Sequence, residues 1–171
     1  MEQVILVDEH DQEIGTMEKM EAHRKGLLHR AFSVLVFNSR GEILVQQRAD
    51  SKYHSAGLWT NTCCSHPRPH ECIQEASARR LREEMGIEAN PEFLFKFTYR
   101  THLERDLVEH EVDHVFTAIF DGTPEANPHE VQAWKFMDLD LLRKDVELHP
   151  SRYTYWFRLI LEHTQLRLRT S

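Results

Sequence analysis

The chain has 171 residues, of which 40% are hydrophobic and 29% are charged, and its formal net charge at pH 7 is -7. This size and composition are typical of one globular domain with an ordinary core, so we expect a single domain over residues 1–171. A negative chain lacks the general positive field that would hold nucleic acid or an anionic membrane, and an anion could bind only where Lys and Arg cluster locally.

The N-terminal segment MEQVILVDEHDQE becomes acidic after a short apolar run. It lacks the basic start and apolar stretch of a signal peptide, and no segment reaches the roughly 20 apolar residues of a membrane span. We therefore expect a cytoplasmic protein without nucleic-acid or membrane partners. Cys63, Cys64 and Cys72 are odd in number and crowded together, which favours reduced thiols over a disulfide framework.

Strand and helix signals then alternate without a repeat or an obvious linker. VILV at 4–7 predicts a strand, and 13–26 predicts a turn followed by an exposed segment. The turn NSRG joins two predicted strands, 31–37 and 42–48, into a hairpin. A helix is expected over 71–86, where an apolar stripe ends at a glycine suited to a left-handed cap. Three further strands and an amphipathic helix are expected at 93–101, 108–120, 131–139 and 151–169. Mixed elements around one sheet predict an α+β fold.

The segment NTCCSHP at 61–67 carries two reactive groups on one side. Pro67 favours an extended backbone at His66, and alternate residues of an extended segment project in the same direction. Cys64 and His66 should therefore face together, while Cys63 and Ser65 turn away.

The segment VEHEV places Glu109 and Glu111 on one face of a predicted strand. Clustered carboxylates inside a fold repel each other and require a metal or basic side chains. His23 and His29, which flank a turn-like KG, are further candidate ligands. Ordinary structural explanations remain open, because a single histidine among 12 is rarely a ligand and alternating glutamates commonly form a solvated strand face.

The helix at 71–86 contains most of a Nudix box, but two positions differ from the pattern. Ser65 stands in place of the leading glycine, and Arg80 stands in place of the glutamate that follows Arg79. In a Nudix hydrolase that glutamate is a principal magnesium ligand, and an arginine would repel the ion. An arginine can instead bind diphosphate oxygens by paired hydrogen bonds, and Glu84 lies four residues further along the same helix face.

Four separated motifs together resemble the type I isopentenyl diphosphate isomerases, the metal-dependent, flavin-free branch of the Nudix fold. They are GLWTN, NTCCSHP, RRLREEMG and VEHEV, and the resemblance extends from EKMEAH to YWF. It implies a Nudix-type α/β/α sandwich around a mixed β-sheet. It also implies an enzyme that isomerises isopentenyl diphosphate to dimethylallyl diphosphate in isoprenoid biosynthesis, with a prenyl diphosphate as its small-molecule partner; we expect a monomer.

The resemblance assigns the catalytic thiol to Cys64 and the catalytic, metal-binding carboxylate to Glu111, with Tyr99 and Trp156 as the active-site tyrosine and tryptophan. The reaction adds one proton to the alkene and removes another. We expect Glu111 to donate, because a metal and a phenol acidify it. Cys64 would accept as a thiolate whose pKa is lowered by nearby positive charge, and the opposite assignment stays open.

The resemblance also implies two kinds of divalent site. The first comprises three histidines and two glutamates, namely His23, His29, His66, Glu109 and Glu111. Such a mixed set suits manganese or zinc, whereas magnesium prefers oxygen and would accompany the diphosphate, held partly by Glu84. The basic residues assigned to the diphosphate are Lys19, Arg48, Lys52 and Arg80.

Two alternatives remain. The first is a Nudix-type diphosphate hydrolase, which Arg80 argues against. The second is a zinc-stabilised binding domain that uses Cys63, Cys64, His66 and Cys72. Adjacent cysteines rarely ligate one ion together, so this spacing fits no tetrahedral zinc template.

Overall fold

The computed structural model describes residues 1–170. The strands are β1 (Gln3–Val7), β2 (Glu13–Glu18), β3 (His29–Phe37), β4 (Ile43–Arg48), β5 (Trp59–Thr60), β6 (Cys63–Ser65), β7 (Glu92–His102), β8 (Val108–Ile119) and β9 (Val131–Met137). The helices are α1 (Lys19–Lys25), α2 (Ile73–Met85), α3 (Leu139–Leu148), α4 (Tyr155–Glu162) and α5 (Thr164–Thr170), with short 3-10 helices at Glu104–Asp106 and Pro150–Arg152. Among these residues, no helix combines the length and the apolar character needed to cross a membrane.

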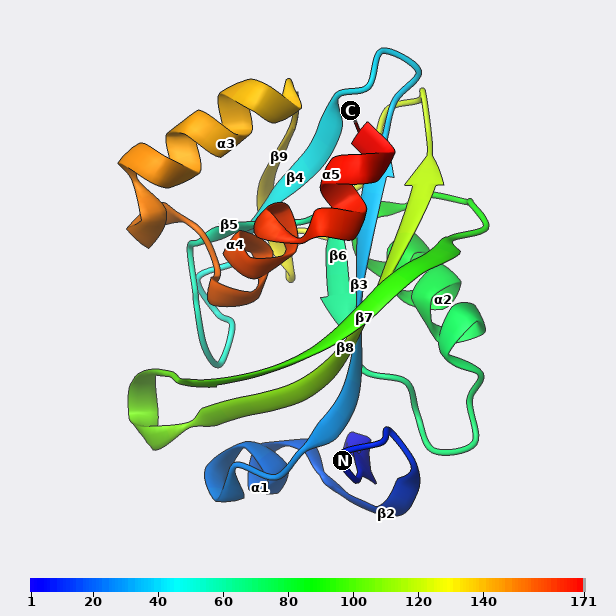
Figure 1. The fold of residues 1–171 in the computed structure, drawn as a ribbon, viewed down its shortest axis with the longest axis vertical. Coiled ribbons are helices and arrows are strands. Elements are labelled where there is room, and N and C mark those ends of the chain that lie inside the picture. Colours follow the sequence, from blue (N-terminus) through cyan, green and yellow to red (C-terminus); the bar gives the residue numbers. More distant parts are fainter. Residues whose placement is uncertain (171) are drawn as a thin grey trace.

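Strand β3 lies at the centre of one mixed sheet (Figure 1). One of its edges pairs in parallel with β8, which pairs in turn with β7 in antiparallel register. The other edge pairs antiparallel with β1, β6 and β4 in succession. Strands β9 and β5 extend the sheet from β4, and β2 extends it from β1.

Helices cover both faces of the sheet because successive side chains of β3 point in opposite directions. Leu35 and Phe37 belong to a core that includes residues of α3, α4 and α5. Val34 and Val36 belong to a second core, which is closed by α2. Figure 1 shows α4 and α5 across one face and α2 on the other side of β3. The predicted α/β/α sandwich around a mixed sheet is therefore confirmed.

Most predicted elements are present, and two predictions are wrong. The segment 13–26 is not an exposed turn but forms β2 and α1, because the Glu18 side chain caps the helix by accepting hydrogen bonds from two backbone N–H groups. The final helix 151–169 is shorter and divided, since the backbone is extended at His163 between α4 and α5. Helix α3 was not expected at all; Asp138 caps its N-terminus.

Gly86 ends α2 with a left-handed backbone, as predicted, and it also lies against another segment. Its φ is 64°, and a Cβ added there would lie 2.7 Å from both the Cβ and the carbonyl oxygen of Glu125. The fold therefore requires glycine at this position for two reasons, backbone conformation and close approach.

We predict that Gly86→Ala lowers the free energy of unfolding by more than about 1 kcal/mol, measured by urea denaturation. Gly41→Ala is the matched control, because Gly41 also has a positive φ, 78°, but an added Cβ meets no atom within 4 Å. The loss should be clearly larger at Gly86. Equal losses at the two positions would show that contact with Glu125 contributes nothing.

Candidate active site

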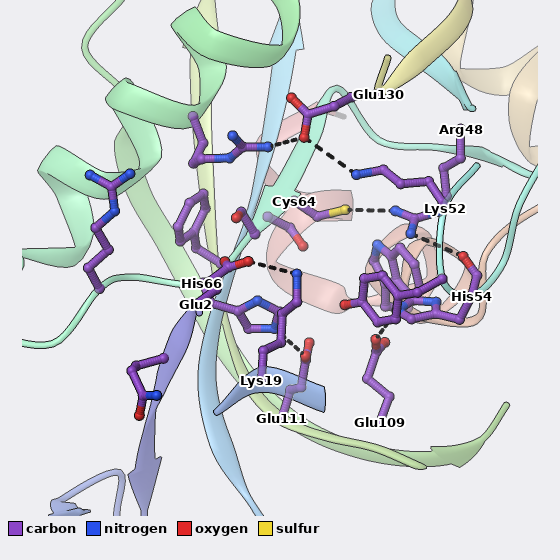
Figure 2. A pocket seen from close by; sticks show the side chains of 18 of the residues that line it. Glu2, Lys19, Arg48, Lys52, His54, Cys64, His66, Glu109, Glu111 and Glu130 are labelled. Atoms are coloured by element: carbon purple, nitrogen blue, oxygen red, sulfur yellow. Dashed lines mark hydrogen bonds and ion pairs between the residues drawn. The ribbon is translucent and has the colours of Figure 1, made fainter. Parts of the chain in front are cut away.

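A cavity of about 510 Å³ opens between the sheet, the loop 49–58 and the start of α4 (Figure 2). Ten of the side chains predicted to form the site line it: Lys19, Arg48, Lys52, Cys64, His66, Arg80, Tyr99, Glu109, Glu111 and Trp156. His23 and His29 are fully buried beside its wall and contact its carboxylates. The structure thus brings together residues from eight strands and helices that are widely separated in the sequence.

Strand register places the two glutamates of β8 inside the site. Glu109 and Glu111 are only 3% and 5% exposed, so the solvated-face explanation is wrong. His29 lies directly across from Glu111 on β3, and the Nε2 atoms of His29 and His66 lie 2.9 and 2.8 Å from the same Oε2 of Glu111. Tyr99, opposite Glu111 on β7, donates to Oε1 of Glu111 at 2.8 Å and also hydrogen bonds to Glu109.

The hydrogen bonds of the histidines fit a bound cation. Nδ1 of His29 lies 2.9 Å from the Leu27 carbonyl and Nδ1 of His23 lies 2.8 Å from the Lys19 carbonyl, so each Nδ1 must carry the proton. A neutral imidazole then has a bare Nε2, and these Nε2 atoms are directed at carboxylates that can only accept. A cation between them satisfies both partners.

Two further observations support the same reading of the cluster. Nε2 of His23 is buried without a hydrogen-bond partner, at 3.9 Å from Glu109. One ligand atom from each of His23, His29, His66 and Glu111 lies within 4.8 Å of the others. Among the described residues this buried histidine and glutamate cluster is consistent with a metal site, and the chemistry of its donors fits a divalent ion.

The imidazoles also determine the charge of the carboxylates. Burial raises the pKa of Glu111, but His66 and His29, when they are protonated and donate to its carboxylate, outweigh this effect and hold the pKa well below its usual value. Burial and Glu111 raise the pKa of Glu109, and the imidazoles of His23 and His54 reverse that shift as well. Both glutamates are therefore anionic near neutral pH and available as ligands.

The three cysteines have different surroundings, as the alternation of β6 predicts. Cys64 faces the cavity, with Nη1 of Arg48 3.9 Å from its sulfur. Cys63 packs in the core under α2 and donates to Glu84 at 2.8 Å, whereas Cys72 is exposed. The thiols do not converge, which contradicts the zinc-stabilised binding domain. Ser65 was expected to turn away, but it also lines the cavity.

The surroundings of Cys64 oppose the expected thiolate. Burial raises the pKa of the Cys64 thiol to about 12, because desolvation disfavours the thiolate. Arg48 and Lys52 act in the opposite direction but are outweighed. These surroundings therefore favour the neutral thiol over the thiolate.

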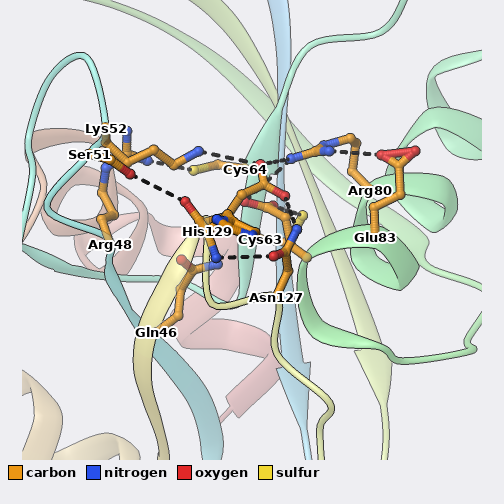
Figure 3. A network of polar contacts seen from close by, with 12 residues as sticks. Gln46, Arg48, Ser51, Lys52, Cys63, Cys64, Arg80, Glu83, Asn127 and His129 are labelled. Atoms are coloured by element: carbon orange, nitrogen blue, oxygen red, sulfur yellow. Dashed lines mark hydrogen bonds and ion pairs between the residues drawn. The ribbon is translucent and has the colours of Figure 1, made fainter.

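The predicted diphosphate-binding cations all line the cavity but are spread along it: Arg80 and Lys52 lie near Glu130, whereas Lys19 lies beside His66 (Figure 2). Arg80 and Lys52 share one partner, Oε1 of Glu130, at 2.5 and 3.5 Å. Figure 3 shows this polar network between the loop 49–58 and α2. Lys19 pairs with Glu2 at 2.7 Å. Arg48 lies deeper, with its guanidinium 5.4 Å from the Trp156 ring.

Glu84 is not among the described residues that line the cavity. It is buried, accepts a hydrogen bond from Cys63, and lies 3.6 Å from Nη2 of Arg80. Burial raises its pKa, and Arg80 opposes the shift. Its predicted role as a magnesium ligand remains a prediction, since Arg80 lies next to its carboxylate.

His54 and Glu130 are among the cavity residues that sequence reasoning missed. His54 lies 3.1 Å from Glu109, and Glu130 holds two of the predicted diphosphate-binding cations. Each belongs to a loop whose conformation no local pattern predicts. Only their positions in the sequence could have indicated that these residues belong to the cavity. His54 is two residues from Lys52, and Glu130 directly precedes a predicted strand.

Comparisons with known proteins agree with this geometry. The family described as NUDIX domain matches residues 27–157. The chain is 53% identical to Isopentenyl-diphosphate Delta-isomerase 1 of Aromatoleum aromaticum, over 94% of this chain and 91% of that protein. It is 48% identical to the Isopentenyl-diphosphate Delta-isomerase of Burkholderia multivorans, over 96% and 94% of the two chains.

Solved structures show the same fold at low sequence identity. A crystal structure from Deinococcus radiodurans matches with a TM-score of 0.79 and 19% identity, over 94% of this chain and 97% of that one. A MutT protein from Methanosarcina mazei matches with a TM-score of 0.68 and 20% identity, over 84% and 96%. Together with the curated relatives, these matches show that the chain belongs to the isopentenyl-diphosphate Delta-isomerases of the Nudix fold.

Proposed function

We propose that this chain isomerises isopentenyl diphosphate to dimethylallyl diphosphate, and that the cavity described above is the active site. The observation that carries the proposal is that Cys64 and Glu111 line one cavity together with the basic side chains of Lys19, Arg48, Lys52 and Arg80. This arrangement provides two groups that exchange protons and a separate place for a diphosphate. The two relatives compared above are both named isopentenyl-diphosphate Delta-isomerases.

The reaction requires two proton transfers at neighbouring positions. One group adds a proton to the terminal carbon of the alkene, and a second group removes a proton from the carbon on the other side of the branched centre. We propose Cys64 and Glu111 as this pair. Because the reaction is reversible, each group donates in one direction and accepts in the other.

The residues around Glu111 hold its carboxylate in place. Tyr99 donates a hydrogen bond to one oxygen, while His29 and His66 lie at the other. We propose manganese or zinc as the ion of the three-histidine, two-glutamate site, where its positive charge would polarise the carboxyl group. Tyr99 is then positioned to transfer a proton to or from the free oxygen.

The basic side chains of the cavity would hold the diphosphate together with magnesium. Lys19, Arg48, Lys52 and Arg80 all line the cavity, and arginine forms paired hydrogen bonds with phosphate oxygens. The Glu130 carboxylate forms ion pairs with Arg80 and Lys52. The diphosphate would therefore compete with Glu130 for these two cations, and its binding energy positions an apolar reacting group that offers no polar contact of its own.

Trp156 is suited to cover the reacting carbons. Its ring lines the cavity, and its Nε1 donates to Asn61 at 3.1 Å, which fixes the orientation of the indole. Protonation of the alkene creates positive charge on carbon, and an indole face stabilises a desolvated cation by about 2 kcal/mol. The same ring excludes water that would otherwise trap the cation.

The hydrolase alternative is disfavoured by the charge of α2. Where a Nudix hydrolase carries a magnesium-binding glutamate, Arg80 contacts Glu83 at 2.8 Å and Glu130 at 2.5 Å. Positive charge at this point attracts a phosphate but repels the ion that hydrolysis requires. Diphosphate binding without cleavage is the expected result.

The proposed function is tested by incubating the protein with isopentenyl diphosphate and magnesium in heavy water. Proton NMR should show loss of the terminal alkene signals and appearance of a dimethylallyl product with deuterium in a methyl group. Release of phosphate or diphosphate, with no migration of the double bond, would instead support hydrolysis.

We predict that Cys64→Ala reduces kcat by at least about 100-fold, because it removes one proton-transfer group. Cys72→Ser is the control, since Cys72 is exposed, and Cys63→Ala tests the neighbouring buried thiol. Both should keep substantial activity. A similar loss in all three variants would remove any special role for Cys64.

We predict that Arg80→Glu raises KM for isopentenyl diphosphate by at least about tenfold, because it places a like charge beside the diphosphate. Arg82→Glu is the matched control on the same helix, where Arg82 is exposed and lies 3.5 Å from Glu88. Steady-state kinetics should show little change in the control. An unchanged KM in Arg80→Glu would exclude this residue from substrate binding.

A further inference from the structure

His54 is a buried histidine of the cavity wall that the resemblance does not assign to the metal site. It lies in the loop 49–58 between β4 and β5, is 3% exposed, and directs Nε2 to within 3.1 Å of Oε2 of Glu109. Its ring stacks on that of His23, with centroids 5.9 Å apart. Figure 2 shows His54 directly above Glu109, on the side of the cluster away from His66.

The orientation of His54 follows the pattern of the histidines already described. His23 and His29 each have Nδ1 against a backbone carbonyl and Nε2 directed at a carboxylate. His54 has Nδ1 3.0 Å from the Ser55 hydroxyl oxygen, which can accept a hydrogen bond from it, and Nε2 toward Glu109. A hydrogen bond of this kind at one nitrogen is typical of histidines that bind a metal through the other.

The loop is held in a conformation that fixes this orientation. Nη2 of Arg48 donates to the His54 carbonyl at 3.1 Å, and the Ser55 backbone N–H donates to Glu104. Ser55 adopts a left-handed φ of 52°, a conformation that a non-glycine residue adopts only where its surroundings enforce it. The His54 ring is further confined by Tyr53, at a centroid distance of 4.4 Å. The side chain is therefore positioned before any ligand binds.

A second observation points to a ligand between these residues. Nε2 of His23 is fully buried and has no hydrogen-bond partner, although Glu109 lies 3.9 Å away. One ligand atom from each of His23, His54 and Glu109 lies within 4.8 Å of the others. His23 also belongs to the cluster formed with His29, His66 and Glu111, so the two groups share one imidazole.

We propose that His54 is a fourth histidine ligand of the metal site, binding a divalent transition ion through Nε2. This inference rests on the proposed metal site and extends it to four imidazoles and two carboxylates. An additional nitrogen donor favours ions such as zinc or cobalt over magnesium, which prefers oxygen. The residue thereby contributes to which ion the site retains.

The test measures metal affinity and does not depend on turnover. Metal-free protein is titrated with Zn²⁺ against a chromophoric chelator, using wild type, His54→Ala and His54→Gln. We expect zinc affinity to fall at least about tenfold in both variants. His149→Gln is the matched control, because His149 is exposed at the end of α3 and should leave the affinity unchanged. Circular dichroism of the metal-free variants verifies that they fold.

The glutamine variant separates a ligand from a residue that only positions Glu109. Glutamine can still donate a hydrogen bond to Glu109 but is a poor ligand for zinc. Affinity at the wild-type level in His54→Gln, or in both variants, would overturn the proposal. The absorption spectrum of the Co²⁺-loaded protein gives a second readout, and it should differ between wild type and His54→Gln because the ion loses one nitrogen ligand.

Discussion

The site depends on two anionic carboxylates that the fold buries side by side on β8. Glu109 and Glu111 are only 3% and 5% exposed, because imidazoles and the Tyr99 phenol pack against their carboxylates. Their repulsion must be offset locally, and three of the surrounding elements each contribute a group: His23 from α1, His29 from β3 and His66 just beyond β6. The imidazoles lower the pKa values of the glutamates but cannot all donate to them, and a cation removes that conflict.

This constraint divides the cavity into two ends with different chemistry. The histidine end would hold the ion and the proton-transfer carboxylate, whereas Arg80 and Lys52 meet at Glu130 at the other end. The acidic chain, with a formal net charge of -7, thus concentrates its positive side chains where an anion is needed.

The parts of the site that lie on strands could be predicted, because strand alternation alone determines which side chains share a face. Cys64 and His66 line one cavity, as do Glu109 and Glu111, and the left-handed cap at Gly86 follows from residue type. The parts contributed by loops could not. His54 reaches Glu109 through a left-handed Ser55, and Glu130 meets Arg80 across 50 residues of sequence; both contacts arise from tertiary packing that no local pattern contains.

The adjacent cysteines show how one step along a strand separates two functions. Cys63 and Cys64 have the same chemistry, but the pleat of β6 directs Cys63 into the core under α2 and Cys64 into the cavity. Cys63 then donates to the buried Glu84, which burial would otherwise leave with an unpaired carboxylate oxygen. A one-residue shift in the pairing of β6 with β3 would exchange the two thiols and move His66 away from Glu111. The register of three residue pairs therefore determines which thiol faces the cavity and whether His66 reaches Glu111.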